Sequence, residues 1–234
     1  MLTALGSITN QQANPTKNKM KKVTQFLDYA ASHPDTIITC NASNMVLAGH
    51  SDASYLYRKK AQSRAGGHFF MSNNSVVPPN NGAVIIIAQI IKTVMSSAAE
   101  AELSALSLDC CEAIQACQAL EEIGHKQPPT PMQTDNTTTY GFVSNNIASK
   151  RLKSMDMQTN WLRCRAPQGQ FRLYWQPGPT NLGNCVTKNH TAIHHRAVHP
   201  TFLTPIQHLE LLRKRALRTF SKLKLQDTSA SRVC

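Results

Sequence analysis

The stretch MVLAGHSDASY at residues 45–55 is rich in residues that favour β-strands, and it carries a single acid, Asp52. A charged side chain inside a strand is costly to bury unless it is paired or binds a cation, so Asp52 is a candidate functional residue. Two further strand-like stretches follow, Gly66–Met71 and Gly82–Ile91, with polar or Gly/Pro-bearing segments between them. Three such strands in succession predict an antiparallel meander.

A long helix is predicted after the meander, from about Ser97 to Ile123. Gly124 is a typical C-terminal cap for it, and QPPTP at 127–131 favours an extended connection. The later predicted elements are a strand at Pro131–Thr134, helices at Thr137–Asn145 and Ser154–Arg165, a strand at Phe171–Trp175 and a short helix from about Leu182. The order βββαβαβα, with one extra helix, predicts an α/β fold.

Both ends of the chain lie outside this pattern. Apolar residues at helical spacing between Thr16 and Ser32, beside several lysines, predict an amphipathic helix, and Thr36–Cys40 is a short candidate strand. Beyond Pro205, leucines at helical spacing accompany seven basic residues and two acidic ones. This tail is interpreted either as a basic helix that is solvated or binds a partner, or as an arm that follows phosphates.

The composition narrows the class of protein. Lysine and arginine number 25 against 13 acids, a formal charge of +12, which indicates a polyanionic partner such as nucleic acid unless the charge only aids solubility. The longest apolar run, Ala83–Ile91, is too short for a membrane helix, and the N-terminus lacks a secretory pattern, so we expect an intracellular protein. Seven cysteines without a CxxC pair argue against a disulfide framework or a zinc ribbon.

Two other acids lie where they could meet Asp52. On the long helix, Glu102 shares a face with apolar residues at steps of three and four, whereas Glu100 is expected to point to solvent. Asp135 lies where a strand passes into a helix, at the sheet edge where ligand groups gather. Capping of that helix is an alternative role for Asp135.

These three carboxylates would repel one another if they converge, so they would favour hard cations between them. Mg²⁺ is the natural counter-ion for such a group of oxygen ligands. Two ions about 3.5 to 4 Å apart could activate water and stabilise the leaving oxygen of a phosphodiester. The pattern therefore favours phosphoryl-transfer chemistry.

Several motifs carry a resemblance to a known family. They are HSDASYL at 50–56, RAGGHFFMS at 64–72, SSAAEAEL at 96–103, QTDN at 133–136, MDMQTNWLRCR at 155–165 and NLGNCVTK at 181–188. In order and spacing they resemble the ribonuclease H region of copia-type LTR retrotransposon Pol polyproteins, over about Met45–His190. The resemblance implies a ribonuclease H-like α/β fold, with three antiparallel strands and then two parallel strands in one five-stranded mixed sheet flanked by helices. It also implies cleavage of the RNA strand of RNA/DNA hybrids.

The resemblance also assigns roles along the chain. Asp52, Glu102 and Asp135 match the family's catalytic acids and would be the ligands of Mg²⁺ or Mn²⁺. Residues 1–44 resemble the segment that connects reverse transcriptase to ribonuclease H, 45–200 the ribonuclease H-like domain, and 201–234 form the basic tail. A reverse transcriptase domain is therefore an expected partner besides the hybrid, although the chain itself has no YxDD polymerase motif.

The chain departs from the family pattern at the last motif. Asn184 stands where the family has a fourth carboxylate, and its amide offers an oxygen without negative charge, so weaker binding of one metal is expected. Gly183 is expected to loosen the short helix. Asn160 also replaces a histidine that often precedes the aromatic residue. The rival interpretation is a catalytically dead, nucleic-acid-binding retrotransposon remnant.

Other side chains are weaker candidates. Four histidines could bind zinc together with Cys185, but their spacing favours ordinary loop histidines: His190, His194, His195 and His199. Four aromatic residues are interpreted as core rather than as a base-stacking platform: Trp161, Phe171, Tyr174 and Trp175. Three arginines are left as contacts to phosphates or to solvent: Arg163, Arg165 and Arg172.

Overall fold

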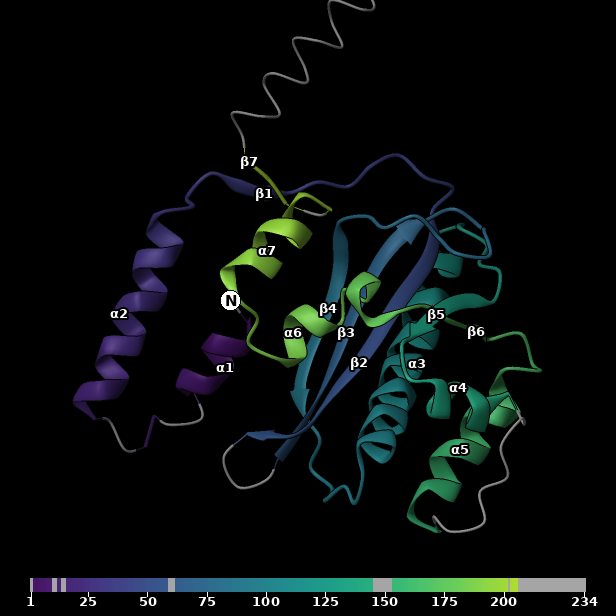
Figure 1. Cartoon of the computed structure of the whole chain (residues 1–234). Coiled ribbons are helices and arrows are strands. Elements are labelled where there is room, and N and C mark those ends of the chain that lie inside the picture. The colour runs from purple at the N-terminus through teal and green to yellow at the C-terminus, as the bar shows by residue number, and fades with distance from the viewer. Residues whose placement is uncertain are drawn as a thin grey trace, which may run out of the picture.

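A five-stranded mixed sheet with strand order β4-β3-β2-β5-β6 forms the centre of the computed structural model (Figure 1). The strands are β2 (Val46–Arg58), β3 (Gln62–Ser72), β4 (Ala83–Ile90), β5 (Thr130–Thr134) and β6 (Phe171–Trp175). β2, β3 and β4 pair antiparallel, whereas β5 pairs parallel to β2 and β6 parallel to β5. The expected sheet, three antiparallel strands and then two parallel ones, is confirmed.

The structure describes residues 2–9, 12–13, 16–58, 62–144, 153–201 and 203–205. The predicted helix beyond Pro205 lies outside these residues. The division at residues 44 and 200 stays a prediction, and several contacts cross it, among them the hydrogen bond from the amide of Asn41 to Asn81 Oδ1 at 2.7 Å. β1 (Thr36–Ile38) pairs antiparallel with β7 (Leu203–Pro205), which ties the segment before the domain to the segment after it.

The long helix α3 (Ala98–Glu122) packs against β2 and β3. It ends as the sequence predicts, because Gly124 adopts the left-handed conformation at φ 93° and the next amide, of His125, donates to the carbonyl of Leu120 at 2.8 Å. Helices α4 (Thr137–Val143) and α5 (Lys153–Arg165) pack beside α3. The main apolar core lies between these helices and the sheet, with fully buried residues such as Phe69, Leu103 and Met132.

The opposite face of the sheet carries a short segment after β6. It consists of η1 (Gly178–Thr180) and the four-residue helix α6 (Asn184–Thr187), which packs on β2 and β3 and lies over the sheet in Figure 1. Successive side chains of a strand point to opposite faces. In β2 this places Ala53 with the α3 side, where it joins a second apolar cluster, and Asp52 with the α6 side.

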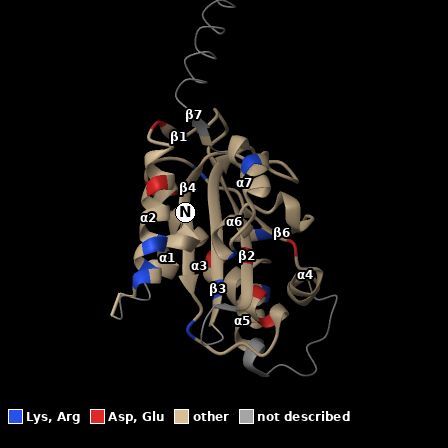
Figure 2. Cartoon of the chain, turned by 60° about the vertical axis from the view of Figure 1, so that its left-hand side comes forward, with Lys and Arg blue, Asp and Glu red and all other residues tan. Residues whose placement is uncertain are grey.

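The N-terminal helices stand beside the sheet in Figure 1. The amphipathic helix is confirmed as α2 (Lys17–Ala31), capped by the side chain of Thr16, and none of its residues is buried. Its lysines gather toward its N-terminal end, as Figure 2 shows. The sequence did not indicate α1 (Leu2–Thr9), which contacts α2 and α6. α7 (Ala192–Val198) and η2 (His199–Thr201) precede β7.

All six described cysteines are free thiols. Each described helix is too short or too polar to cross a lipid bilayer.

Candidate metal centre

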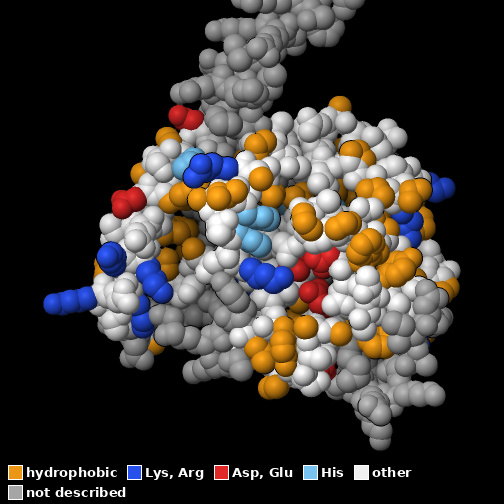
Figure 3. Space-filling model, in the orientation of Figure 1, with side chains coloured by type: hydrophobic (Ala, Val, Ile, Leu, Met, Phe, Trp, Pro, Cys, Tyr) orange, Lys and Arg blue, Asp and Glu red, His pale blue; other side chains and the backbone are white. Residues whose placement is uncertain are grey.

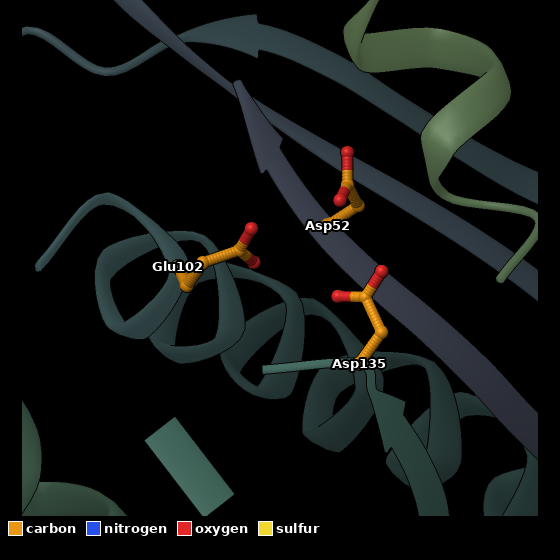
Figure 4. A group of neighbouring side chains, drawn as sticks. All are labelled: Asp52, Glu102 and Asp135. Carbon is orange, nitrogen blue, oxygen red and sulfur yellow. The ribbon is translucent and has the colours of Figure 1, made fainter. Parts of the chain in front are cut away.

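Asp52, Glu102 and Asp135 lie together at one edge of the sheet. Each offers a carboxylate oxygen, and these oxygens all lie within 4.8 Å of one another. The three side chains come from the middle of β2, the first turns of α3 and the residue after β5, and they point toward one another in Figure 4. β2 and β5 run parallel, so the segment after β5 ends beside Asp52. The structure thus brings the three predicted acids into one group.

Asp52 is the buried member of this group, with an exposed fraction of 0%. The hydroxyl of Thr187 donates to its Oδ2, and the ammonium of Lys188 lies 3.5 Å from its Oδ1. Oδ1 has no hydrogen-bond donor of its own. Burial raises the pKa of Asp52 to about 6, although Lys188 and Thr187 oppose the rise. A buried carboxylate oxygen without a donor is well suited to a cation.

Glu102 is half-buried and is held by the backbone of the central strand. The amide of Ala53 donates to Glu102 Oε2 at 3.1 Å. Burial raises the pKa of Glu102 well above its usual range, and the charges of Asp52 and Asp135 add to the rise. These carboxyls therefore hold protons more tightly than free ones when no cation neutralises them.

The expectation that Glu100 points to solvent is wrong. Glu100 is 5% exposed, and its Oε2 accepts hydrogen bonds from the amide of Ser96 at 2.6 Å and from the hydroxyl of Ser96 at 2.5 Å. The Ser97 side chain in turn accepts from the amide of Glu100. This reciprocal capping satisfies donors at the start of α3, which helical periodicity alone does not reveal.

The alternative role of Asp135 as a helix cap is also not what the structure shows. The side chain of Asn136 caps α4, because its Oδ1 accepts a hydrogen bond from the amide of Thr139 at 3.0 Å. Asp135 is fixed through its backbone instead, since the indole of Trp175 donates to its carbonyl at 3.0 Å. Its carboxylate is left to face the other two acids.

Asn184 lies beside the acidic group, buried, at the start of α6. Its Nδ2 donates to the carbonyl of Gly178 at 2.9 Å, and its Oδ1 accepts from the ammonium of Lys188 at 3.2 Å. Both ends of the amide are therefore engaged by groups of this chain. The oxygen that would coordinate a metal already has a cationic partner.

The sequence did not indicate how the segment before α6 is held on β2. His50 lies two residues before Asp52 on the same face, and its Nδ1 accepts from the amide of Leu182 at 3.1 Å. Its Nε2 lies 3.3 Å from the hydroxyl of Tyr174. Burial lowers the pKa of His50 to about 3, so the ring is neutral with its proton on Nε2, which donates to Tyr174. Asn181 adds a hydrogen bond to the carbonyl of Ser51 at 2.7 Å.

Gly183 lies before α6 and not within it, so the expected cost of a glycine inside a helix does not arise at this position. It precedes the helix in right-handed conformation, and a Cβ there would lie about 3.0 to 3.1 Å from the carbonyl oxygen of Gly66 and the amide of Asp52. The absence of a side chain thus lets the start of α6 approach the two central strands closely. Close approach is one of the physical uses of glycine.

Gly66 makes the matching contact from β3, where it pairs with Asp52. A Cβ on Gly66 would lie 2.8 Å from Cγ2 of Val186 and closer still to Thr187. The lack of a side chain at Gly66 therefore lets α6 lie directly on β3.

We expect Gly66→Ala to push α6 from the sheet, lower the free energy of unfolding by about 1 to 3 kcal/mol and weaken Mn²⁺ binding. Gly82→Ala is the matched control, since Gly82 is equally crowded by Ile38 and Thr39 elsewhere in the protein. Thermal melting and Mn²⁺ titration check this, and equal loss of affinity in both variants would contradict it.

The histidines after α6 and Cys185 lie close together. The rings of His190 and His194 stack at 4.0 Å, and Cys185 Sγ lies 3.9 Å from Nε2 of His194. Within the described part of the chain, however, the acidic group is the only set of three such ligands whose atoms lie within 4.8 Å of one another. The interpretation as ordinary histidines is favoured.

The aromatic residues are mostly core, as expected. Phe171 and Tyr174 are buried, and Trp161 stacks on Phe171 with ring centroids 6.3 Å apart. Trp175 is the exposed member, at 42%, and holds Asp135 through its indole.

Two of the three arginines bind the chain's own backbone. Arg163 donates to the carbonyl of Phe142 at 2.6 Å, and Arg172 donates to the carbonyls of Ser75 and Val76. The guanidinium of Arg165 lies 5.8 Å from the ring centre of Trp161. Arg163 and Arg172 therefore serve the fold.

No protein-family model and no curated protein sequence matches this chain. Among solved structures, it is similar to the N-terminal RNase H domain of a Mycobacterium tuberculosis protein, with TM-score 0.41 and 13% identity over 66% of this chain and 99% of that one. LC11-RNase H1 in complex with an RNA/DNA hybrid gives TM-score 0.40 and 9% identity over 60% and 92% of the two chains. The RNase H domain of prototype foamy virus gives TM-score 0.36 and 16% identity over 60% and 88%.

Proposed function

We propose that this chain is a metal-dependent ribonuclease that acts on the RNA strand of RNA/DNA hybrids, with its activity lowered by Asn184. The observation that supports it most directly is the convergence of Asp52, Glu102 and Asp135 within 4.8 Å. The motifs that carry these acids also resemble the ribonuclease H region of copia-type Pol polyproteins, which we propose as the origin of the chain.

The donor set fits a hard divalent cation. Mg²⁺ and Mn²⁺ prefer oxygen ligands, and three carboxylates supply them without any sulfur or imidazole. Oδ1 of Asp52 has no hydrogen-bond donor and only the ammonium of Lys188 beside it, at 3.5 Å. Burial raises the pKa of Asp52 and Glu102, so a bound cation would favour their ionised forms. A bound divalent ion would supply Lewis-acid stabilisation of phosphodiester oxygens and lower the pKa of a water molecule.

The residues of this chain would act mainly by holding these groups in place. Ala53 orients Glu102 through its amide, Thr187 orients Asp52 through its hydroxyl, and Trp175 fixes the backbone of Asp135. Rigid placement of ligands is what a metal-dependent phosphoryl transfer requires of the protein.

Substrate binding would rest on charge and shape. The net charge of +12 favours a polyanion, with affinity that falls as salt rises. Recognition of a hybrid through its backbone and 2′-hydroxyls would give little sequence specificity. A reverse transcriptase domain is the proposed further partner, since residues 1–44 resemble the segment that connects such a domain to ribonuclease H.

The test is cleavage of a hybrid that carries the label on its RNA strand, in Mg²⁺ or Mn²⁺. We expect slow cleavage by the unaltered protein and cleavage about 10-fold to 100-fold faster by Asn184→Asp, because a fourth carboxylate then joins the group. Asn74→Asp is the matched control, since it adds the same charge at an exposed loop position. Double-stranded DNA should remain intact.

The rival function is a nucleic-acid-binding remnant without activity. The observation that favours it is the engagement of the Asn184 amide by Lys188 and Gly178. Salt-dependent hybrid binding without cleavage in both the unaltered protein and Asn184→Asp would establish the remnant and overturn the proposed activity.

A further inference from the structure

We propose that the ammonium of Lys188 takes the place of a second cation beside Asp52, so that this centre holds a single divalent ion. The inference rests on the proposed function, in that the acidic group must bind a metal. It goes beyond that function because it assigns a stoichiometry and gives Lys188 a defined role.

The position of Lys188 is the first observation. Its Nζ lies 3.5 Å from Oδ1 of Asp52 and 3.2 Å from Oδ1 of Asn184, so one ammonium bridges both oxygens. The Asp52 oxygen has no hydrogen-bond donor, and the Asn184 oxygen is the one that would serve a metal. A second divalent ion shared between Asp52 and Asn184 would have to displace Lys188 from both.

The backbone around Lys188 favours this placement. Lys188 follows α6 directly as its C-terminal capping residue, in extended conformation, and its amide donates to the carbonyl of Asn184 at 3.4 Å. The same carbonyl lies 2.8 Å from Nε2 of His190 and accepts from the hydroxyl of Thr187. These hydrogen bonds hold the backbone at the end of α6 in place, and the side chain of Lys188 extends from there toward Asp52. The side chain is 39% exposed, which keeps its charged end partly hydrated.

Charge balance points in the same direction. Three ionised carboxylates carry three negative charges, which one divalent ion and one ammonium neutralise. Because Asn184 is neutral, two divalent ions beside Lys188 would leave an excess of positive charge within a few ångströms. Like charges about 4 Å apart repel by about 1 kcal/mol even in water, and more strongly where water is excluded.

The surface view agrees with this arrangement. In Figure 3, basic and acidic side chains adjoin near the middle of the displayed face, with histidines next to the basic group. Among the described residues, Lys188 is the only Lys or Arg that forms a salt bridge with an acid of the site. The positive charge next to the acids therefore belongs to the protein.

The test is titration of the folded protein with Mn²⁺. Binding is monitored by calorimetry and by the electron paramagnetic resonance signal of the Mn²⁺ that stays free. We expect one ion per chain for the unaltered protein and two for Asn184→Asp. Lys188→Met should bind its first ion at least about five-fold more tightly, because about 1 kcal/mol of repulsion is removed. Lys188→Arg, which keeps the charge, should retain one ion.

Lys126→Met is the matched control, since Lys126 is exposed in the loop before β5. Loss of its charge should change neither the number of bound ions nor their affinity. Two ions of similar affinity on the unaltered protein, or unchanged affinity in Lys188→Met, would overturn this inference while leaving the metal centre in place. Failure of every folded variant to bind Mn²⁺ would overturn the proposed function as well. Circular dichroism establishes that each variant is folded.

Discussion

Asp52→Asn is expected to remove Mn²⁺ binding and hybrid cleavage while raising the melting temperature. Asp52 is the central acid of the group, with Lys188 and Thr187 on one side and Glu102 and Asp135 on the other. Loss of a direct carboxylate ligand should weaken metal binding by more than about 100-fold, since loss of an indirect partner already costs 10-fold to 100-fold. Cleavage should fall below detection accordingly.

The gain in stability follows from the buried charge. Burial raises the pKa of Asp52 from 3.8 to about 6, so the folded protein binds this proton more tightly than the unfolded chain. The protonated Asp52 therefore makes its full contribution to the free energy of unfolding below about pH 4. This contribution is lost as the pH rises to about 6 and Asp52 ionises in the folded protein. Asparagine carries no such cost, so at pH 8 the variant should be more stable by about 1 to 3 kcal/mol.

Thermal melting at pH 8 without metal, together with Mn²⁺ titration, measures both effects in one preparation. Asp28→Asn is the control, because Asp28 is exposed on α2 and its change should alter neither quantity. Retention of metal-dependent cleavage by Asp52→Asn would refute the assignment of this site. A lower melting temperature with lost cleavage would show that Asp52 serves the fold instead.

Asp109→Asn is expected to stabilise the protein strongly at alkaline pH. Asp109 lies on α3 with an exposed fraction of 0%, packed against Gly67 of β3 on the face opposite α6. Neither of its carboxylate oxygens has a donor in hydrogen-bonding geometry. Burial raises its pKa to about 8, and the hydroxyl of Ser51 lowers it only in part. An unpaired buried carboxylate is among the costliest groups in a protein interior.

The stability of the folded protein depends on pH through Asp109. The unfolded chain ionises Asp109 near pH 3.8 and the folded protein near pH 8, so unfolding becomes steadily easier between these values. Each tenfold change in proton affinity is worth about 1.4 kcal/mol, which sets an upper limit of roughly 6 kcal/mol above pH 8. Asp109→Asn should therefore raise the free energy of unfolding by about 2 to 5 kcal/mol at pH 9 and change it little at pH 4.

Urea unfolding from pH 4 to pH 9 measures this difference. Glu122→Gln is the matched control, since Glu122 is exposed on the same helix and its replacement should leave the pH profile unchanged. An identical slope for Asp109→Asn and the unaltered protein would show that Asp109 does not stay protonated in the folded state.

Local pattern determined much of the fold. The content of strand-favouring residues at 45–55, the cap signal at Gly124 and the period of α3 depend on neighbours along the chain, so the sequence predicted β2, α3 and β6 closely. The phase of α3 also selected Glu102 over Glu100 as the acid for the site. The prediction for Glu100 itself was wrong, because end effects replace periodicity in the first turn of a helix.

The surroundings of the acids required the tertiary structure. Asp52 and Lys188 are far apart in the sequence, and only the packing of α6 on β2 and β3, through Gly66 and Gly183, brings the ammonium beside the carboxylate. His50 likewise meets Leu182 only in the folded chain. No local pattern encodes such pairs, because they depend on strand order and register.

The sequence alone therefore determined which three acids to consider, and its resemblance to the family singled out Asn184 as an uncharged residue at the expected fourth position. The tertiary structure decided what surrounds them: Asn136 caps α4 in place of Asp135, and Lys188 engages the amide of Asn184. The physical reason is that secondary structure follows from short-range periodicity and caps. The balance of charge in a buried site depends instead on distances between residues that only the fold brings together.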